Sequence, residues 1–348
     1  MSRRTLPTDI PILAPQPRNR QVILSSRPAG VPQPEHFEIR ESSVPDPGPG
    51  QYRVRNIYLS VDPAQRGWAS SEANYSTPVS LGAPMRALAV GIVDASSCDQ
   101  VEEGEYLYGW FGWQDYAIAD PSAILLRAER KLPLAQFAGL LGINGLTAHL
   151  ALTRLGRPER GDTLLVTTSA GGVGSLVGQI GRILGCRTLG LTGSDEKAEA
   201  CRNIYGYDHA WNYKTAAVAE VLEAAAPAGI DVFYDNTGGP MLDLVLRRMA
   251  VGGRVVQCGT ASVSGWSPLP SGPRNEREIL TRRLQWSGFV IFDHQNSFSH
   301  SADQLADWYQ AGRIDLNLEV LSGIEHAPGS VRDLYEGRNR GKRLISLV

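Results

Sequence analysis

The pattern of hydrophobic positions changes about a third of the way along the chain. Before about residue 130, short β-prone runs are separated by proline and glycine clusters, which is typical of a β-rich domain. The runs cover residues 20–24, 37–41, 51–60, 87–94 and 116–118. From about Leu132, strand-like runs alternate with helical segments, a pattern that predicts a doubly wound parallel sheet. We therefore expect an α/β protein with two domains.

The expected domains do not follow the chain in one simple order. Residues 1–17 form a proline-rich extension of uncertain order, interrupted by prolines at 7, 11, 15 and 17. We assign residues 18–130 to the β-rich domain and residues 131–310 to the dinucleotide-binding domain. The tail, residues 311–348, is expected to fold back onto the β-rich domain.

The second domain contains a strand, a turn and a helix in close succession. Residues 163–167 are apolar and β-branched, which predicts a buried strand, and a second strand is expected at 187–192. Later elements are expected at 215–226 (helix), 230–235 (strand), 240 onward (helix), 254–258 (strand), 286–291 (β-prone), 301–310 and 330–336 (helices) and 344–348 (strand). Between the first strand and its helix lies a glycine-rich turn. Its Gly171, Gly172, Val173 and Gly174 predict a pyrophosphate site at the helix start.

The end of the second strand indicates which dinucleotide binds. An NAD site usually has an acidic residue there to hold the ribose 2′-hydroxyl, whereas this chain has Thr192-Gly193-Ser194. Lys197 follows and is available for a 2′-phosphate. An isolated lysine is also typical of a solvated helix surface, and Asp195 and Glu196 add negative charge nearby. The segment favours NADPH.

Composition excludes several classes of protein. The 348 residues are 42% hydrophobic and 20% charged with a net charge of −2, so no basic surface for nucleic acid or an anionic membrane is expected. The four cysteines have neither zinc-ligand nor disulfide-framework spacing, which favours a reducing, cytoplasmic setting. No apolar segment has the length of a signal peptide or a membrane span.

Several motifs together resemble the medium-chain dehydrogenase/reductase superfamily, in particular its zinc-free prostaglandin and alkenal double-bond reductases. They include Leu59-Ser-Val-Asp-Pro63, Gly145-Leu-Thr-Ala148, Gly193-Ser-Asp-Glu-Lys197 followed by Asn212-Tyr-Lys214, and Gly337-Arg-Asn-Arg-Gly-Lys342. The ordered pair at 193–197 and 212–214 is the specific part. The resemblance implies a GroES-like substrate domain and a Rossmann domain.

The resemblance also assigns roles to single residues. It implies that the glycine turn holds the pyrophosphate and that Lys197 and Tyr213 lie at the 2′-phosphate. Asn339 is implied at the nicotinamide end. Further residues implied to line the cofactor are Asn236, Cys258, Gly259, Thr260, Phe289 and Val290. From the residues alone, Asn236 is equally suited to capping the next helix, and Asn339 is typical of a turn.

No zinc ligands are expected. The zinc-dependent relatives carry a Gly-His-Glu segment and a lobe of four closely spaced cysteines, and this chain has neither. Without zinc, alcohol dehydrogenation lacks its Lewis acid. Reduction of an activated C=C bond needs only hydrogen bonds and a proton for the enolate.

The chain departs from the family at two tyrosines. Ala64 directly follows the Asp-Pro motif and Ser264 lies six residues after Cys258, where relatives usually have phenols. The remaining candidates to assist the enolate are Tyr58, Tyr75 and Ser264, and both tyrosines are equally typical of packing residues.

The leading hypothesis is an NADPH-dependent reductase that transfers hydride to the activated C=C bond of a small-molecule α,β-unsaturated carbonyl substrate. A quinone reductase, with tryptophans 68, 110, 113 and 266 forming an aromatic slot, and a cofactor-binding protein with little catalysis are the alternatives. The β-prone run at 286–291 would leave an unpaired strand at the sheet edge, which favours a homodimer.

Overall fold

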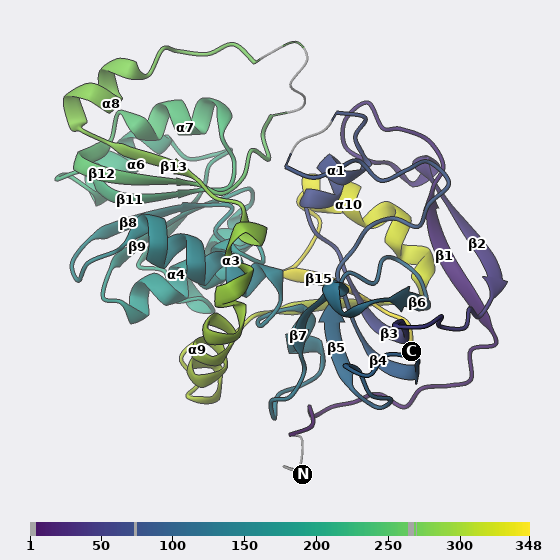
Figure 1. Ribbon diagram of the computed structural model, residues 1–348. Coiled ribbons are helices and arrows are strands. Elements are labelled where there is room, and N and C mark those ends of the chain that lie inside the picture. The colour runs from purple at the N-terminus through teal and green to yellow at the C-terminus, as the bar shows by residue number, and fades with distance from the viewer. Residues whose placement is uncertain (1–4, 73–74, 264–267, 269) are drawn as a thin grey trace. The chain divides into compact units, whose positions relative to one another are not determined.

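The computed structural model describes residues 5–72, 75–263, 268 and 270–348, and the chain divides into two compact units (Figure 1). Unit 1 is Met1–Gly142 with Leu318–Val348, and unit 2 is Ile143–Asn317. The sequence placed these boundaries at 130 and 310. The first lies later because α2 (Ala135–Ala138) packs against strands of unit 1. The second lies later because the backbone of Asp315 exchanges hydrogen bonds of 2.8 and 2.9 Å with the Gln179 side chain of unit 2.

The main sheet of unit 1 has the strand order β14-β15-β3-β4-β5-β7, with β6 paired to β3. Its strands are β3 (Tyr52–Ser60), β4 (Ala89–Ser96), β5 (Tyr106–Gly109), β6 (Tyr116–Ala119), β7 (Ile124–Arg127), β14 (Leu318–Ser322) and β15 (Lys342–Ser346). Strand β15 pairs antiparallel with β3, while β14 pairs parallel with β15. The C-terminal segment therefore completes a sheet that the first part of the chain began.

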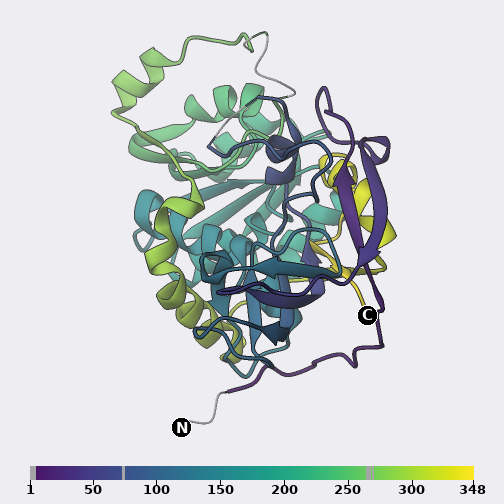
Figure 2. The same ribbon diagram turned by 45° about the vertical axis from the view of Figure 1, so that its right-hand side comes forward.

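Unit 1 also has a separate two-stranded antiparallel ribbon, β1 (Arg18–Leu24) and β2 (Phe37–Ser43). Helix α10 (Ala327–Tyr335) lies beside this ribbon in both views and contacts the short helix η1 (Pro34–His36) between its strands (Figure 2). The remaining helices of unit 1 are α1 (Ala64–Ala69), η2 (Pro121–Ala123) and η5 (Ile324–His326).

The described part of the N-terminal extension, residues 5–17, is bound to unit 1 at both ends. The Thr8 amide donates to the Leu132 carbonyl at 2.8 Å, and the Thr8 carbonyl accepts from the Leu134 amide at 2.9 Å. At the other end, the Gln16 side chain donates to Asp115 at 2.9 Å, and its carbonyl accepts from the Tyr116 hydroxyl at 2.9 Å.

The sheet of unit 2 is parallel throughout its described strands, with the order β10-β9-β8-β11-β12-β13. The strands are β8 (Thr163–Thr167), β9 (Arg187–Thr192), β10 (His209–Asn212), β11 (Ile230–Asp235), β12 (Met249–Gln257) and β13 (Gln285–Gly288). Numbered along the chain, this is the order 3-2-1-4-5-6 of a dinucleotide-binding fold. The predicted α/β class with a β-rich and a doubly wound sheet is confirmed.

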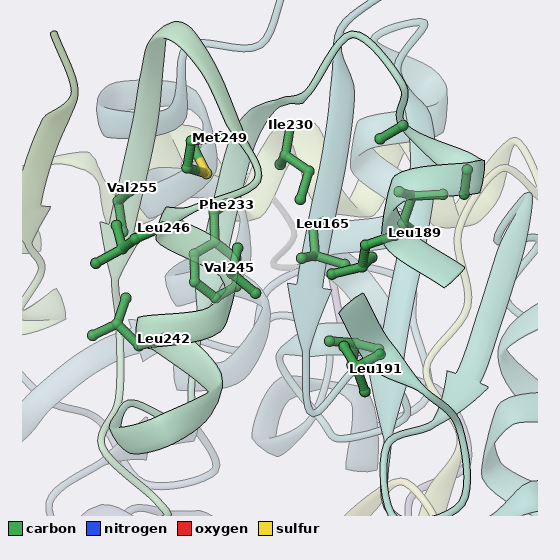
Figure 3. Close-up of a cluster of buried hydrophobic side chains, with 14 of the residues drawn as sticks. Leu165, Leu189, Leu191, Ile230, Phe233, Leu242, Val245, Leu246, Met249 and Val255 are labelled. Atoms are coloured by element: carbon green, nitrogen blue, oxygen red, sulfur yellow. The ribbon is translucent and has the colours of Figure 1, made fainter. Parts of the chain in front are cut away.

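Helices cover both faces of the parallel sheet because successive strand residues point to opposite sides. On one face, Leu165 and Phe233 pack with α6 and α7 in the buried cluster of Figure 3. On the other, Leu164 faces α4 at Gly181, and Val232 faces the π-helical turn η3 at Gly156. The helices are α3 (Ile143–Ala151), η3 (Leu152–Gly156), α4 (Gly174–Ile183), α5 (Asp195–Asn203), α6 (Val218–Ala225), α7 (Gly239–Leu246), α8 (Glu276–Arg282), η4 (Ile291–Ser297) and α9 (Phe298–Gln310).

The β-prone run at 286–291 is only partly a strand. β13 ends at Gly288, and the chain enters the 3-10 helix η4 at Ile291. The strand lies at the sheet edge, as expected, and pairs with β12 on one side among the described strands.

A histidine is buried in the core of unit 2. The Nδ1 atom of His149 lies 2.7 Å from the Ser301 hydroxyl, and its ring packs edge-on to Trp308 at 5.6 Å. The side chain is 9% exposed. Burial, helped by the nearby charges of His300 and Arg154, lowers the pKa of His149 to about 4.

This pKa predicts how stability depends on pH. The folded state resists protonation of His149 while the unfolded chain accepts a proton near pH 6.5, so its contribution is complete above pH 6.5 and is lost as the pH falls to 4. The loss is on the order of 3 kcal/mol. In urea titrations between pH 7 and 4, wild type should lose this increment and His149→Gln should not. Parallel curves for the two proteins would contradict the assignment.

Candidate functional site

The carboxyl ends of β8 and β11 meet at the point where the strand order of unit 2 reverses. From β8 the chain builds outward to β9 and β10, and then returns to place β11 on the other side of β8. In such sheets the ligand crevice lies at this switch point. The residues that follow β8 and β11 are therefore the first candidates for cofactor contact.

The turn after β8 is tight and needs its glycines. Thr168 has a left-handed backbone with φ of 55°. A Cβ atom on Gly174 would lie 2.3 Å from the Thr168 carbonyl oxygen, so only glycine allows helix α4 to start this close to the strand. The carbonyl of Gly174 in turn accepts a 2.5 Å hydrogen bond from the Tyr207 hydroxyl, which fixes the first turn of α4.

The same turn presents free hydrogen-bond donors. Among the described residues, none accepts a hydrogen bond from the amides of Gly172 or Val173, which directly precede α4. Unpaired amides at a helix start, together with the helix dipole, form an anion site. The geometry of residues 171–174 therefore suits an anionic group, and the pyrophosphate role of this turn stays a prediction.

A buried carboxylate holds the strand ends together. Asp235, at the end of β11, is 0% exposed. One of its oxygens accepts from the Thr167 hydroxyl at 2.8 Å, and the other accepts from the Gly238 amide at 2.9 Å and the Gln257 side chain at 2.9 Å. The strand ends of β8, β11 and β12 and the start of α7 are thus tied to one side chain.

Asn236 belongs to this network. Its side-chain amide donates to the Thr167 carbonyl at 2.7 Å, and its backbone amide donates to the Thr167 hydroxyl at 2.8 Å. It therefore caps strand β8 rather than helix α7, whose N-cap is Gly238. Asn236 is half-buried and lies at the switch point.

Cys258, Gly259 and Thr260 follow β12 at the same edge. The amides of Cys258 and Gly259 donate to the Asp235 carbonyl at 2.8 and 3.1 Å, and Thr260 is exposed. The Tyr234 hydroxyl lies 3.3 Å from the Cys258 sulfur. Burial raises the pKa of the Cys258 thiol to about 11, so it is a neutral lining group at pH 7 rather than a nucleophile.

Phe289 and Val290 follow edge strand β13. The Phe289 amide donates to the Gln257 carbonyl at 3.1 Å, and its ring is 8% exposed and stacked on His294 at 4.8 Å. Val290 is half-buried. These positions continue the row of strand ends from β8 to β13.

The ends of β9 and β10 bring two lysines and a tyrosine to the other side of the crevice. Lys197 lies in the first turn of α5, where its amide donates to the capping Ser194 hydroxyl at 3.2 Å. Tyr213 is tied to the end of β9 by a 3.0 Å bond to the Thr192 carbonyl. A Cβ atom on Gly193 would lie 3.6 Å from the Tyr213 hydroxyl and 3.7 Å from the Lys214 side chain. Sequence reasoning had quoted Lys214 only as part of a motif.

Four further candidates lie outside unit 2's described site. Tyr58 lies in β3, half-buried, and burial together with the Asp9 carboxylate raises its pKa. Tyr75 is 55% exposed. Asn339 lies in unit 1 on the segment between α10 and β15, and its side chain donates to the Gly341 carbonyl at 2.7 Å. Ser264 lies outside the described residues.

Asp235 is the last residue of the strand predicted at 230–235, and the sequence analysis predicted no functional role for it. A carboxylate at the end of a buried strand is a signal that could have identified the network, because such a group must be fully hydrogen-bonded. In the described part of the chain, no group of three or more His, Cys, Asp or Glu side chains could hold a metal ion. None of the described helices has the length and apolar character needed to cross a membrane.

Comparison with known families agrees with this geometry. Residues 20–126 match a family described as the N-terminal domain of oxidoreductase, and residues 172–308 match one described as zinc-binding dehydrogenase. The second match begins within the glycine turn and ends in α9.

Full-length relatives extend the match to nearly the whole chain. The NADPH-dependent curcumin reductase of Escherichia coli (strain K12) is 35% identical over 336 residues, covering 95% of this chain and 97% of that protein. The NADP(+)-dependent 2-alkenal reductase of Nicotiana tabacum is 32% identical, covering 96% and 98%. The crystal structure of CurA from Vibrio vulnificus in complex with NADPH superimposes with a TM-score of 0.88 at 35% identity, covering 94% and 98%. The chain therefore belongs to the medium-chain dehydrogenase/reductase superfamily of oxidoreductases.

Proposed function

We propose that this protein is a zinc-independent, NADPH-dependent reductase of the activated C=C bond in α,β-unsaturated carbonyl compounds. The observation that carries the cofactor choice is the end of β9, where Tyr213 and Lys214 lie beside Gly193, Lys197 follows in the first turn of α5, and residues 192–194 include no carboxylate to serve as a ribose ligand. Bound NADPH supplies the hydride. The relatives named for curcumin and 2-alkenal reduction support the substrate class.

The residues of unit 2 have separate tasks in this proposal. The amides of Gly172 and Val173 hold the pyrophosphate, with Gly171 and Gly174 giving the backbone its close approach. Asn236, Cys258, Gly259, Thr260, Phe289 and Val290 line the cofactor along the strand ends. In unit 1, Asn339 is proposed to meet the nicotinamide end. Because none of these groups is a Lewis acid, the carbonyl oxygen must be stabilised by hydrogen bonds.

The quinone alternative has less support. Trp68 is 2% exposed and packs against Trp110 at 5.3 Å, and Trp113 is 0% exposed and donates to the Ser60 carbonyl at 3.0 Å. These tryptophans serve packing, and Trp266 lies outside the described residues. An open aromatic slot for a flat quinone is therefore not assembled by them.

A substrate screen tests the proposed function. NADPH consumption should be rapid with 2-alkenals and enones, slower with quinones, and negligible without an acceptor, because the hydride acceptor is an activated double bond. Activity should survive dialysis against a chelator, since no described side chains supply a zinc site. Turnover of quinones alone, NADPH binding without turnover, or loss of activity that zinc restores would each refute the proposal.

Cofactor preference is tested at Lys197. One charge-assisted hydrogen bond to a 2′-phosphate contributes about 1.5–3 kcal/mol, so Lys197→Ala should weaken NADPH binding about 10- to 100-fold and leave NADH binding unchanged. Lys131→Ala, an exposed lysine of unit 1, is the control. Lys197→Ala/Lys214→Ala should lower the preference further. If the single and double variants both keep the wild-type ratio of NADPH to NADH affinity, neither Lys197 nor Lys214 binds the 2′-phosphate.

We further propose that the protein forms a homodimer through the free edge of β13. Two large apolar side chains in this part of unit 2 are exposed: Trp286 on β13 is 41% exposed, and Leu280 on α8, which packs against β12, is 76% exposed. The Phe289 amide donates to the Gln257 carbonyl of β12, so the alternate amide of Gly288 faces the free edge. Gly288→Pro removes this edge donor and should convert a dimer to a monomer by light scattering at micromolar concentration. Val320→Lys, on edge strand β14 of unit 1, is the control that should stay dimeric. A monomeric wild type would reject this interface.

A further inference from the structure

A strained threonine lies directly after β8, where the glycine turn begins. Thr168 has a left-handed backbone with φ of 55°. Of the four described non-glycine residues with positive φ, it alone is β-branched, and a β-branched residue is an outlier in that conformation because its side chain crowds the backbone. Glycine would adopt the same conformation without strain. A side chain that strains the backbone in a ligand crevice indicates a functional role.

The Thr168 hydroxyl is available to a ligand. The residue is exposed, and its methyl carbon Cγ2 lies 3.2 Å from the place of a Cβ atom on Gly171, so the side chain lies against the glycine turn. The neighbouring Thr167 hydroxyl is occupied, since it donates to Asp235 and accepts from the Asn236 amide. Within the described part of the chain, no group makes a hydrogen bond with the Thr168 hydroxyl. This hydroxyl can therefore both donate to and accept from a bound molecule.

Thr168 lies between the two places proposed for the charged groups of the cofactor. Its carbonyl accepts a 2.9 Å hydrogen bond from the Gly171 amide, in the turn proposed to hold the pyrophosphate. The next amide, that of Ser169, donates at 3.1 Å to the Leu191 carbonyl of β9, the strand whose end is proposed to meet the 2′-phosphate. In NADPH, the adenosine ribose joins these two groups, because it carries the 2′-phosphate and is linked to the pyrophosphate through its 5′ carbon.

We propose that Thr168 binds the adenosine ribose of NADPH, with its hydroxyl sharing a hydrogen bond with the ribose 3′-hydroxyl. The inference rests on the proposed function and deepens it by naming a residue for the part of the cofactor between the two charged groups. NADH carries the same 3′-hydroxyl. Thr168 therefore contributes to the affinity for both dinucleotides, whereas Lys197 distinguishes between them.

Three substitutions of Thr168 separate binding from strain. Thr168→Ala removes the hydroxyl and should weaken NADPH and NADH binding about 3- to 10-fold each, the contribution of one neutral hydrogen bond. Thr168→Ser keeps the hydroxyl and should bind both as wild type does. Thr168→Gly removes hydroxyl and strain together, so it should weaken binding like Thr168→Ala while its melting temperature rises by about 2 °C. A purely structural role would move affinity and stability in the same direction.

A cofactor fragment locates the contact without any turnover. Adenosine 2′,5′-bisphosphate has the ribose but no nicotinamide, and by calorimetry Thr168→Ala should weaken its binding by the same factor as that of NADPH. Arg283→Gly is the matched control, because Arg283 is an exposed residue with φ of 52° at the end of α8. This variant should gain melting temperature and keep wild-type affinity for both ligands.

Two results would overturn the inference: a Thr168→Ala protein that binds NADPH and the bisphosphate as tightly as wild type, or a Thr168→Ser protein that binds them as weakly as Thr168→Ala. A wild type that binds neither NADPH nor the bisphosphate would instead overturn the proposed function. The two failures are therefore distinguishable.

Discussion

The fully buried carboxylate of Asp235 determines the geometry of the nucleotide site. Taking a carboxylate out of water is costly unless its oxygens are hydrogen-bonded. Here they accept from the Thr167 hydroxyl, from the amides of Thr237 and Gly238, and from the Gln257 side chain, at 2.8 to 2.9 Å. Because the buried Asp235 carboxylate needs all of these hydrogen bonds, it holds the carboxyl ends of β8, β11 and β12 next to one another. The turns proposed to contact the cofactor, at 168–174, 236–239 and 258–260, start from that edge.

Unit 1 also contains buried charges, which form an ion pair between Lys342 and Asp62. Lys342 and Asp62 are both buried, and each has its remaining hydrogen-bonding atoms occupied by the surrounding turn. A buried pair of this kind contributes little net stability compared with apolar packing, but removing one partner leaves an uncompensated charge. Its role is therefore positional. It holds the last strand, β15, and the end of β3 in a single register.

The sequence alone determined the elements whose periodicity is strong. The bounds of β8, β9 and β11 are those that their apolar runs predicted, because buried parallel strands have near-continuous hydrophobic sequences. Strands β5, β7, β10 and β14 were not predicted. They are only four or five residues long and are stabilised by their sheet neighbours rather than by their own pattern.

The glycine turn and the missing acid after β9 were likewise readable from the sequence, since both depend on local backbone chemistry. Tertiary structure decided the rest. Only pairing of β10 with β9 brings Tyr213 and Lys214 beside Gly193. Only the return of the chain to unit 1 brings Lys342 to Asp62. A sequence specifies which groups are present, but long-range contacts are fixed by packing, and packing depends on all the residues that compete for the same buried space.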